Sequence, residues 1–441
     1  MKLAFKRKDM DIGTPAFLWM RAMTPTASGG ADISECLKAI ERIGTGGDAS
    51  WVKEWRALAE TIEAKGRAWL AEGQTVSARN ALMRASSYFR TALIRCSPSD
   101  RAADDLLTCS RECFETAAPM FEQPIEIVRV PYMGRVLPAY FISAGRHDAP
   151  TLIGAAGGDS TNEEMIHVLG FAAQQRGWNF LAFEGPGQYT ARQLNPDLHL
   201  RPDWEVPTGA VIDWLLQRPE VDPDKIALFG WSLSSNLVIR AAALDGRVAA
   251  VICNGLIVDV FEAWFGVWPK WLQRASPKRF DWCFHLLEKL SSQVRALTGI
   301  FYKLHGVDTP SAMIQAWRPF NVADMAEKLT CPTLFVLGEA EYAEQSAGPM
   351  ILAAARFLAA LKAPAWIREF GYGDGWAASH CQIGAANALQ EVVYDWLDMI
   401  LVHPERQTAK QRRHDFSLLM RYFGKLSGLR ELSERIHVRS F

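Results

Sequence analysis

The sequence lacks the features of membrane-bound, nucleic-acid-binding and secreted proteins. Its formal net charge is only −1 over 441 residues, so it has no excess of basic residues for nucleic acid or an anionic membrane. No apolar run approaches the roughly 18 residues of a membrane-spanning helix. Residues 1–10 are charged and lack the apolar core of a signal peptide. These absences favour a cytoplasmic protein that binds neither membranes nor nucleic acid.

The sequence also lacks paired cysteine motifs and the motifs of cofactor-binding loops. The eight cysteines are scattered and form no C-x-x-C pair, so we expect reduced thiols rather than disulfides. The run Glu184-Gly-Pro-Gly-Gln188 lacks the spacing of a phosphate or dinucleotide loop, and no histidine–carboxylate cluster suggests a metal. We therefore expect no cofactor and no metal. Because Glu184–Gln188 follows a predicted strand, it either shapes a site at the end of that strand or forms a structural turn.

The patterns that are present predict an α/β fold. Apolar residues recur every three or four positions within residues 31–122, as in Trp51–Ala59, which indicates helices. Alternating residues on both sides of Tyr132-Met-Gly-Arg135 predict an antiparallel hairpin. Short apolar strands then alternate with helices, which is typical of a mostly parallel sheet. These strands are predicted at Thr151–Gly154, Asn179–Phe183, Lys225–Phe229, Val248–Cys253, Thr333–Leu337 and Ala365–Phe370.

The same patterns divide the chain into three parts. Residues 1–122 are predicted to form an N-terminal helical cap, residues 123–402 the sheet domain, and residues 403–441 a C-terminal helical extension. A helical insertion at about 260–319 interrupts the sheet domain where a lid would lie. This insertion is rich in large aromatic residues, and we expect some to line an apolar substrate pocket while others fill a core. The extension, basic near Lys410–Arg413 and amphipathic over Phe416–Leu432, is predicted to be a packed helix or an oligomer contact.

The segment Ile226–Ala243 carries the strongest functional signal. It predicts a buried strand, a turn of small residues around Ser232, and a helix. A sharp strand–turn–helix of this kind lifts a serine hydroxyl above the sheet, as in a nucleophile elbow. The turn requires small neighbours, here Gly230 and Ser234, although the usual pattern has a second glycine where Ser234 stands. We therefore predict that Ser232 is a nucleophile; an ordinary β–α turn is the alternative.

A serine nucleophile needs a base and a group that orients the base. In the α/β-hydrolase order, an acid and then a histidine follow the serine, each after a late strand. His380 lies in the loop after the strand Ala365–Phe370 and is the predicted base. The acid should follow the strand Thr333–Leu337, and Glu341, three residues beyond Gly338, is the first choice. Glu339 and Asp374 stay open as alternatives.

An oxyanion hole needs two converging N–H donors. One is predicted to be the backbone N–H of Leu233, directly after the nucleophile. The other is predicted to come from the glycine-containing loop after the strand at Thr151, with Gly158 or Asp159 as the donor. A plain turn in this loop is the alternative.

With these residues assembled, the chain resembles a particular α/β-hydrolase branch. The branch holds the fermentation-respiration switch esterases, 2,6-dihydroxypseudooxynicotine hydrolase and the fungal yellowish-green hydrolases that shorten a polyketide. The resemblance covers roughly residues 35–400, and Ser234 and Glu341 depart from its pattern. It rests on the elbow and on the segments Trp51–Trp55, Ser77–Arg90, Gly157–Glu164, Glu184–Gln188 and Arg201–Glu205.

The resemblance implies an α/β-hydrolase fold with a helical cap, a homodimer, and no cofactor. It implies both esterases and enzymes that cleave a carbon–carbon bond beside a ketone; we favour carbon–carbon cleavage of a small aromatic or polyketide-like substrate. An additional carboxylate could position the substrate, with Asp259 and Glu262 as candidates and Trp264 beside them. Three alternative functions stay open. They are hydrolysis of an ester, thioester or lactone; acyl transfer or cyclisation; and a non-catalytic binding role.

Overall fold

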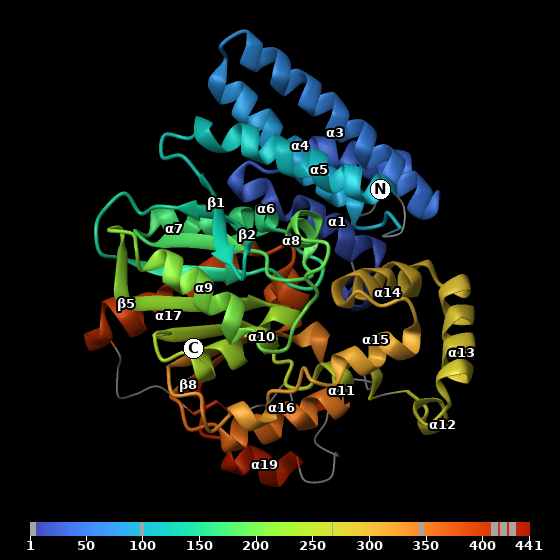
Figure 1. Ribbon diagram of the computed structural model, residues 1–441, viewed down its shortest axis with the longest axis vertical. Coiled ribbons are helices and arrows are strands. Elements are labelled where there is room, and N and C mark those ends of the chain that lie inside the picture. The colour runs from blue at the N-terminus through green and yellow to red at the C-terminus, as the bar shows by residue number, and fades with distance from the viewer. Residues whose placement is uncertain are drawn as a thin grey trace.

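A nine-stranded sheet runs through the described part of the molecule (Figure 1). The structure, a computed structural model, describes residues 6–97, 101–266, 268–343, 348–406, 413–414, 421–422 and 429–441. The strands are β1 Glu126–Tyr132, β2 Arg135–Ile142, β3 Ala149–Ala155, β4 Asn179–Phe183, β5 Val221–Trp231, β6 Ala250–Asn254, β7 Thr333–Gly338, β8 Ala365–Phe370 and β9 Arg439–Ser440. Their order is β1-β2-β4-β3-β5-β6-β7-β8-β9, and only β2 is antiparallel to its neighbours. The predicted hairpin and mostly parallel sheet are confirmed.

Helices cover both faces of this sheet. The longer helices before β5 are α1 Pro15–Met23, α2 Ile33–Ile43, α3 Gly47–Ala71, α4 Thr75–Leu93, α5 Arg101–Ala117 and α9 Glu205–Leu215, and the shorter ones are α6 Asn162–Met165, α7 Phe171–Gln175 and α8 Tyr189–Leu194. Those after β5 are α10 Leu233–Leu244, α11 Val260–Phe265, α12 Lys270–Gln273, α13 Pro277–Leu290, α14 Ser292–His305, α15 Pro310–Trp317, α16 Gly348–Ala360, α17 Ala386–Leu397 and α19 Leu429–Arg435. In the described residues, no helix is both long and apolar enough to cross a bilayer.

Successive residues of the central strands contribute to two hydrophobic cores, one on each face. Leu152 of β3 packs with α1–α5 and α17, whereas its neighbour Ile153 packs with α9, α10 and α16. In β5, Phe229 belongs to the same core as Leu152, and its neighbour Leu228 belongs to the same core as Ile153. Because side chains alternate across a strand, both faces of the sheet are apolar and both require a helical cover.

The N-terminal region is helical, with α3, α4 and α5 side by side (Figure 1). Its helices begin earlier than the periodicity indicated, since α1 starts at Pro15, with Thr14 as a side-chain cap. The buried residues of α4, including Tyr88 and Phe89, pack with those of α3 and α5 in the same core as the sheet face. The first helices are therefore joined to the sheet by a continuous apolar core.

The insertion between β6 and β7 is helical and forms α11–α15. Its aromatic residues pack mainly on one another: Trp268 stacks on Phe284 with 5.2 Å between ring centroids, and Phe301 meets both Trp264 and Trp317 edge-on at 5.0 Å. Most of the predicted aromatic cluster is thus packed core, continuous with the core on one face of the sheet.

The end of the chain contributes to the sheet, which the sequence patterns did not predict. Residues Arg439–Ser440 form β9, parallel to β8, and α19 packs against α16. Apart from Arg413, the Lys410–Arg413 segment lies outside the described residues, as does most of Phe416–Leu432. The extension is therefore a packed part of the fold where the structure describes it, and it includes a strand.

Candidate active site

Ser232 occupies a strained turn between β5 and α10. Its backbone has φ 55° and ψ −118°, a conformation that residues other than glycine rarely adopt. The Ser232 N–H donates to the Asn254 carbonyl at 3.0 Å, which ties the turn to the end of β6. Strained backbone of this kind persists only where its surroundings hold it, and it is concentrated at functional sites.

Gly230 and Ser234, two positions before and after Ser232, are closely packed in the turn. A side chain at Gly230 would collide with the Ser234 carbonyl and with Val238, so glycine is required there. Ser234 is fully buried, and its hydroxyl donates to the Ala156 carbonyl. The departure from the usual pattern thus adds a hydrogen bond between the turn and the loop after β3.

Ser232, His380 and Glu341 form a continuous chain of contacts. The Nε2 atom of His380 lies 2.8 Å from Ser232 Oγ, and its Nδ1 atom lies 3.2 Å from Glu341 Oε1. Glu341 ends the short helix η6 (Glu339–Glu341) after β7, and His380 begins η9 (His380–Gln382), which follows β8. Because β5, β7 and β8 are parallel, their carboxyl ends lie at the same edge of the sheet and bring these distant residues together.

The alternative acids face other partners. Glu339 is buried and accepts hydrogen bonds from Tyr372 N at 2.8 Å, Tyr422 Oη at 2.7 Å and Arg421 Nη1 at 3.1 Å. Asp374 accepts from the backbone of its own loop, at Gly371 N. Of the three candidate carboxylates, the structure places Glu341 against His380.

The surroundings of His380 make its imidazole a stronger base. Burial alone would lower the pKa of His380, but the adjacent Cys381 and the Glu341 carboxylate act in the opposite direction and raise this pKa well above its usual value. Cys381 and Gln382 both have positive φ, 57° and 52°, so the backbone after the histidine is strained as well. An imidazolium formed at this position would be stabilised by Glu341.

The loop after β3 lies against Ser232 and presents unpaired N–H groups. A side chain at Gly157 would approach Trp231 O to 2.9 Å and Ser232 Cβ to 3.4 Å, which shows how closely this backbone packs. Among the described residues, no acceptor is found for the N–H groups of Leu233, Gly158 or Asp159. An oxyanion hole requires free N–H donors of this kind, so the assignment of Leu233 with Gly158 or Asp159 stays a prediction.

The Glu184–Gln188 run supports this loop from behind. Gln188 Nε2 donates to the carbonyls of Ala156 at 2.6 Å and Gly157 at 3.0 Å. The buried Glu184 carboxylate accepts from the backbone N–H groups of Asn162 and Thr190, and burial together with the nearby Glu163 raises its pKa to about 7. The run is a structural turn that shapes the site by fixing the loop after β3.

A buried charge network, which the sequence analysis missed, connects this loop with the N-terminal helices. Arg21 of α1 pairs with Asp159 at 2.7 Å and with Glu164 at 2.8 Å, and Arg90 of α4 pairs with Glu164 at 2.8 Å. Arg90 Nη2 also donates to the Asp159 carbonyl at 2.7 Å. Burial alone would raise the pKa of Asp159, but the charge of Arg21 lowers it to about 2. Asp159 is therefore an anion held by two helices.

Comparison with known proteins agrees with this geometry. The model of the FrsA-like esterases matches residues 41–270, just over half of the chain. Hydrolase LUC6 from a Fusarium species is 30% identical over 411 residues, which span 87% of this chain and 95% of that protein. The chain belongs to the FrsA-like esterase family.

Further relatives of this FrsA-like protein include fungal hydrolases. The 20-hydroxy-prefusarin hydrolase FUS2 of Gibberella moniliformis is 29% identical over 87% of this chain and 95% of its own length. Among solved structures, the 2,6-dihydroxy-pseudo-oxynicotine hydrolase superposes with a TM-score of 0.68 at 21% identity, covering 88% of this chain and 96% of that one. The protein is an α/β-hydrolase enzyme with a helical N-terminal region.

The three candidate substrate-positioning residues of this FrsA-like hydrolase lie at the start of the insertion. Asp259 caps α11, with Oδ1 accepting from Glu262 N at 2.9 Å and Oδ2 from Asn321 Nδ2 at 2.5 Å. Trp264 packs edge-on against Phe301, which in turn lies next to Gly158. No contact joins Asp259 or Glu262 to Ser232 or His380, and the contacts of Asp259 favour a helix cap over the positioning role, which stays a prediction.

Proposed function

We propose that this enzyme is a serine hydrolase that cleaves a carbon–carbon bond next to a carbonyl group. The observation that carries the proposal is the contact chain from Ser232 through His380 to Glu341. His380 accepts the Ser232 hydroxyl proton at Nε2 while the serine oxygen attacks the carbonyl carbon. The negative charge that develops on the carbonyl oxygen is stabilised by the N–H groups of Leu233 and of Gly158 or Asp159.

The tetrahedral intermediate then breaks its carbon–carbon bond. The leaving carbon keeps the bonding electron pair and takes the proton from the His380 imidazolium, while the acyl group stays on Ser232. A water molecule, deprotonated by His380, next attacks the acyl-enzyme, and the product leaves as a carboxylic acid. Only a stabilised carbanion, such as an enolate or an electron-rich aromatic ring, can leave in this way, so the proposed substrate is an aromatic or polyketide-like ketone.

Similarity to hydrolases supports this reaction class, and two relatives are named for the compounds 20-hydroxy-prefusarin and 2,6-dihydroxy-pseudo-oxynicotine. The second candidate is hydrolysis of an ester, thioester or lactone, because the matching family model is that of esterases. Both reactions use the same serine, base and oxyanion donors.

Intact mass after treatment with a fluorophosphonate tests the nucleophile. One adduct on the wild type that is lost in Ser232→Ala is the expected result. No adduct on folded wild-type protein would contradict an activated serine and would favour a binding role.

A comparison of the turnover of an acyl phloroglucinol with that of an aryl ester tests whether the enzyme prefers to cleave a carbon–carbon bond or an ester bond. We expect the ketone to be cleaved with the higher kcat/KM. The product mass must increase by one water, because acyl transfer to a substrate hydroxyl, or cyclisation, would add none.

A further inference from the structure

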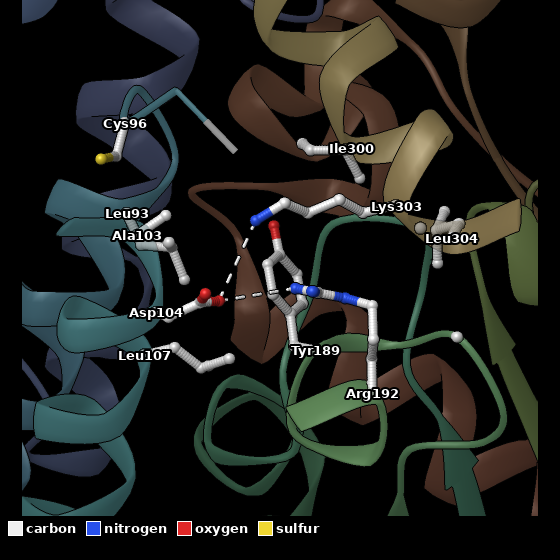
Figure 2. Close-up of a pocket in the computed structure, with 12 residues that line it drawn as sticks. Leu93, Cys96, Ala103, Asp104, Leu107, Tyr189, Arg192, Ile300, Lys303 and Leu304 are labelled. Atoms are coloured by element: carbon white, nitrogen blue, oxygen red, sulfur yellow. Dashed lines mark ion pairs between the residues drawn. The ribbon is translucent and has the colours of Figure 1, made fainter. Parts of the chain in front are cut away.

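A pocket next to the proposed oxyanion loop joins the N-terminal helices to the insertion (Figure 2). The space between its walls, with the open solvent at its mouth included, is about 470 Å³. Apolar walls come from both sides, with Leu93 and Leu107 on α4 and α5 and Ile300 and Leu304 on α14. The pocket is thus suited to an apolar chain or ring.

Gly158 belongs to the wall of this pocket and connects it with Ser232. A side chain at Gly158 would meet Leu233 Cδ2 at 3.4 Å, and its neighbour Gly157 packs against Ser232. A molecule in the pocket would therefore extend to the loop that carries the proposed oxyanion donors. This position fits the part of a substrate that lies beyond its reacting carbonyl.

Two cations and one anion also line the pocket. Arg192 Nη2 lies 3.8 Å and Lys303 Nζ lies 4.0 Å from the same carboxylate oxygen, Oδ1 of Asp104. Both distances exceed that of a hydrogen bond. Within the described residues, neither cationic side chain donates a hydrogen bond to a protein group. The described residues that line the pocket therefore carry one excess positive charge.

The exposed fractions of these side chains also favour binding of an anion by the two cations. The side chains of Lys303 and Arg192 are 27% and 20% exposed, whereas that of Asp104 is 50% exposed and so remains hydrated. Figure 2 shows the Tyr189 side chain extending toward the Lys303 ammonium. Burial raises the pKa of Tyr189, so its phenol stays protonated and can donate as well.

We propose that Arg192 and Lys303 bind a carboxylate at the end of the substrate remote from the cleaved bond. This inference rests on the proposed function for the position of the reacting carbonyl at Ser232. A guanidinium and an ammonium in the wall of a mainly apolar pocket match a monoanion with a hydrophobic body. One excess positive charge is too little for a phosphate dianion. The substrate class is therefore an acyl compound with a free carboxylate.

A binding experiment tests this subsite without catalysis. In Ser232→Ala protein, 4-phenylbutyrate is titrated calorimetrically beside its neutral amide. We expect the acid to bind about tenfold more tightly than the amide, and Lys303→Gln or Arg192→Gln to abolish that preference. Lys303→Arg should retain it. Lys53→Gln, which removes a charge from the exposed face of α3, is the matched control and should leave both affinities unchanged.

Asp104→Asn separates ligand binding from a structural role. If the three charges only hold α5 to α8 and α14, this change weakens the fold and does nothing to the acid's affinity. If they form an anion subsite, it removes the competing carboxylate, and 4-phenylbutyrate should bind several-fold more tightly. Equal binding of acid and amide, no binding of either, or an acid preference that survives both glutamine substitutions would overturn the inference.

Turnover distinguishes failure of the subsite from failure of the proposed function. For the enzyme with Ser232 intact, mono-p-nitrophenyl adipate should have a KM about tenfold below that of p-nitrophenyl hexanoate, and Lys303→Gln should remove the difference. Hydrolysis of both esters with equal KM contradicts the subsite alone. Absence of Ser232-dependent hydrolysis of either ester contradicts esterase turnover, while the binding result on Ser232→Ala stands independently.

Discussion

Arg21 and Asp159 are joined by an ion pair of 2.7 Å between Nη1 and Oδ2, although they are 138 positions apart in the sequence. The pair connects the first α-helix with the loop that carries the proposed oxyanion donors. Arg21 also pairs with Glu164, and its own side chain is buried. The position of this loop therefore depends on the N-terminal helices.

Replacement of Arg21 by methionine should disturb both stability and catalysis. It leaves Asp159 and Glu164 with Arg90 as their remaining cation, and loss of one partner from a buried network costs about 3 to 5 kcal/mol. We expect a loss of about 3 kcal/mol in the free energy of unfolding in urea. We also expect kcat to fall about tenfold or more, because the loop is less firmly held.

Arg56→Met is the matched control, since Arg56 pairs with Glu60 on the exposed surface of α3. Such surface pairs contribute about 0.5 kcal/mol and have no connection to the loop. A kcat for folded Arg21→Met equal to that of Arg56→Met would show that the network does not position the catalytic loop.

The pH dependence of kcat/KM should report the contact between Glu341 and His380. His380 accepts a proton only when neutral, so activity is lost as the pH falls through its pKa. The Glu341 carboxylate raises that pKa. Glu341→Gln should therefore move the acid limb of the profile to lower pH, and the plateau should fall about a hundredfold or more because the imidazolium loses its partner. Glu339→Gln should leave the acid limb in place, whereas a shift with that variant would assign the acid to Glu339.

The sequence predicted those parts of the site that have a local signature. Ser232 lies in a strand–turn–helix pattern, and His380 and Glu341 each follow an apolar strand, so short segments sufficed to locate them. Arg21 and Arg90 are surrounded by ordinary amphipathic helix, and their partners lie 138 and 74 positions later in the chain. Such long-range pairs leave no local pattern. For the same reason the two-residue strand β9 was missed, because it is defined by its pairing with the distant strand β8 and with Arg413.

Substitutions of Ser234 test why the elbow has a serine where the usual pattern has a second glycine. Ser234→Ala removes the hydrogen bond to the Ala156 carbonyl, which still accepts from Gln188, so we expect a loss of about 1 kcal/mol in the free energy of unfolding. Ser234→Gly restores the usual pattern but should cost more, because glycine loses more conformational entropy on folding. Urea unfolding of both variants measures the difference. A glycine variant more stable than the wild type would show that the serine hydroxyl contributes nothing here.

The variant Asp259→Ala tests whether Asp259 is a helix cap or a group that positions the substrate. Its two carboxylate oxygens are occupied by the N-terminus of α11 and by Asn321. Because loss of an N-cap costs about 1 kcal/mol, Asp259→Ala should lower the free energy of unfolding by that amount. We expect kcat and KM of the folded enzyme to stay within about twofold of the wild type, as they should for the neighbouring variant Glu262→Gln. A fall in kcat without loss of stability in Asp259→Ala would instead place this carboxylate at the substrate, since a cap acts only through the fold.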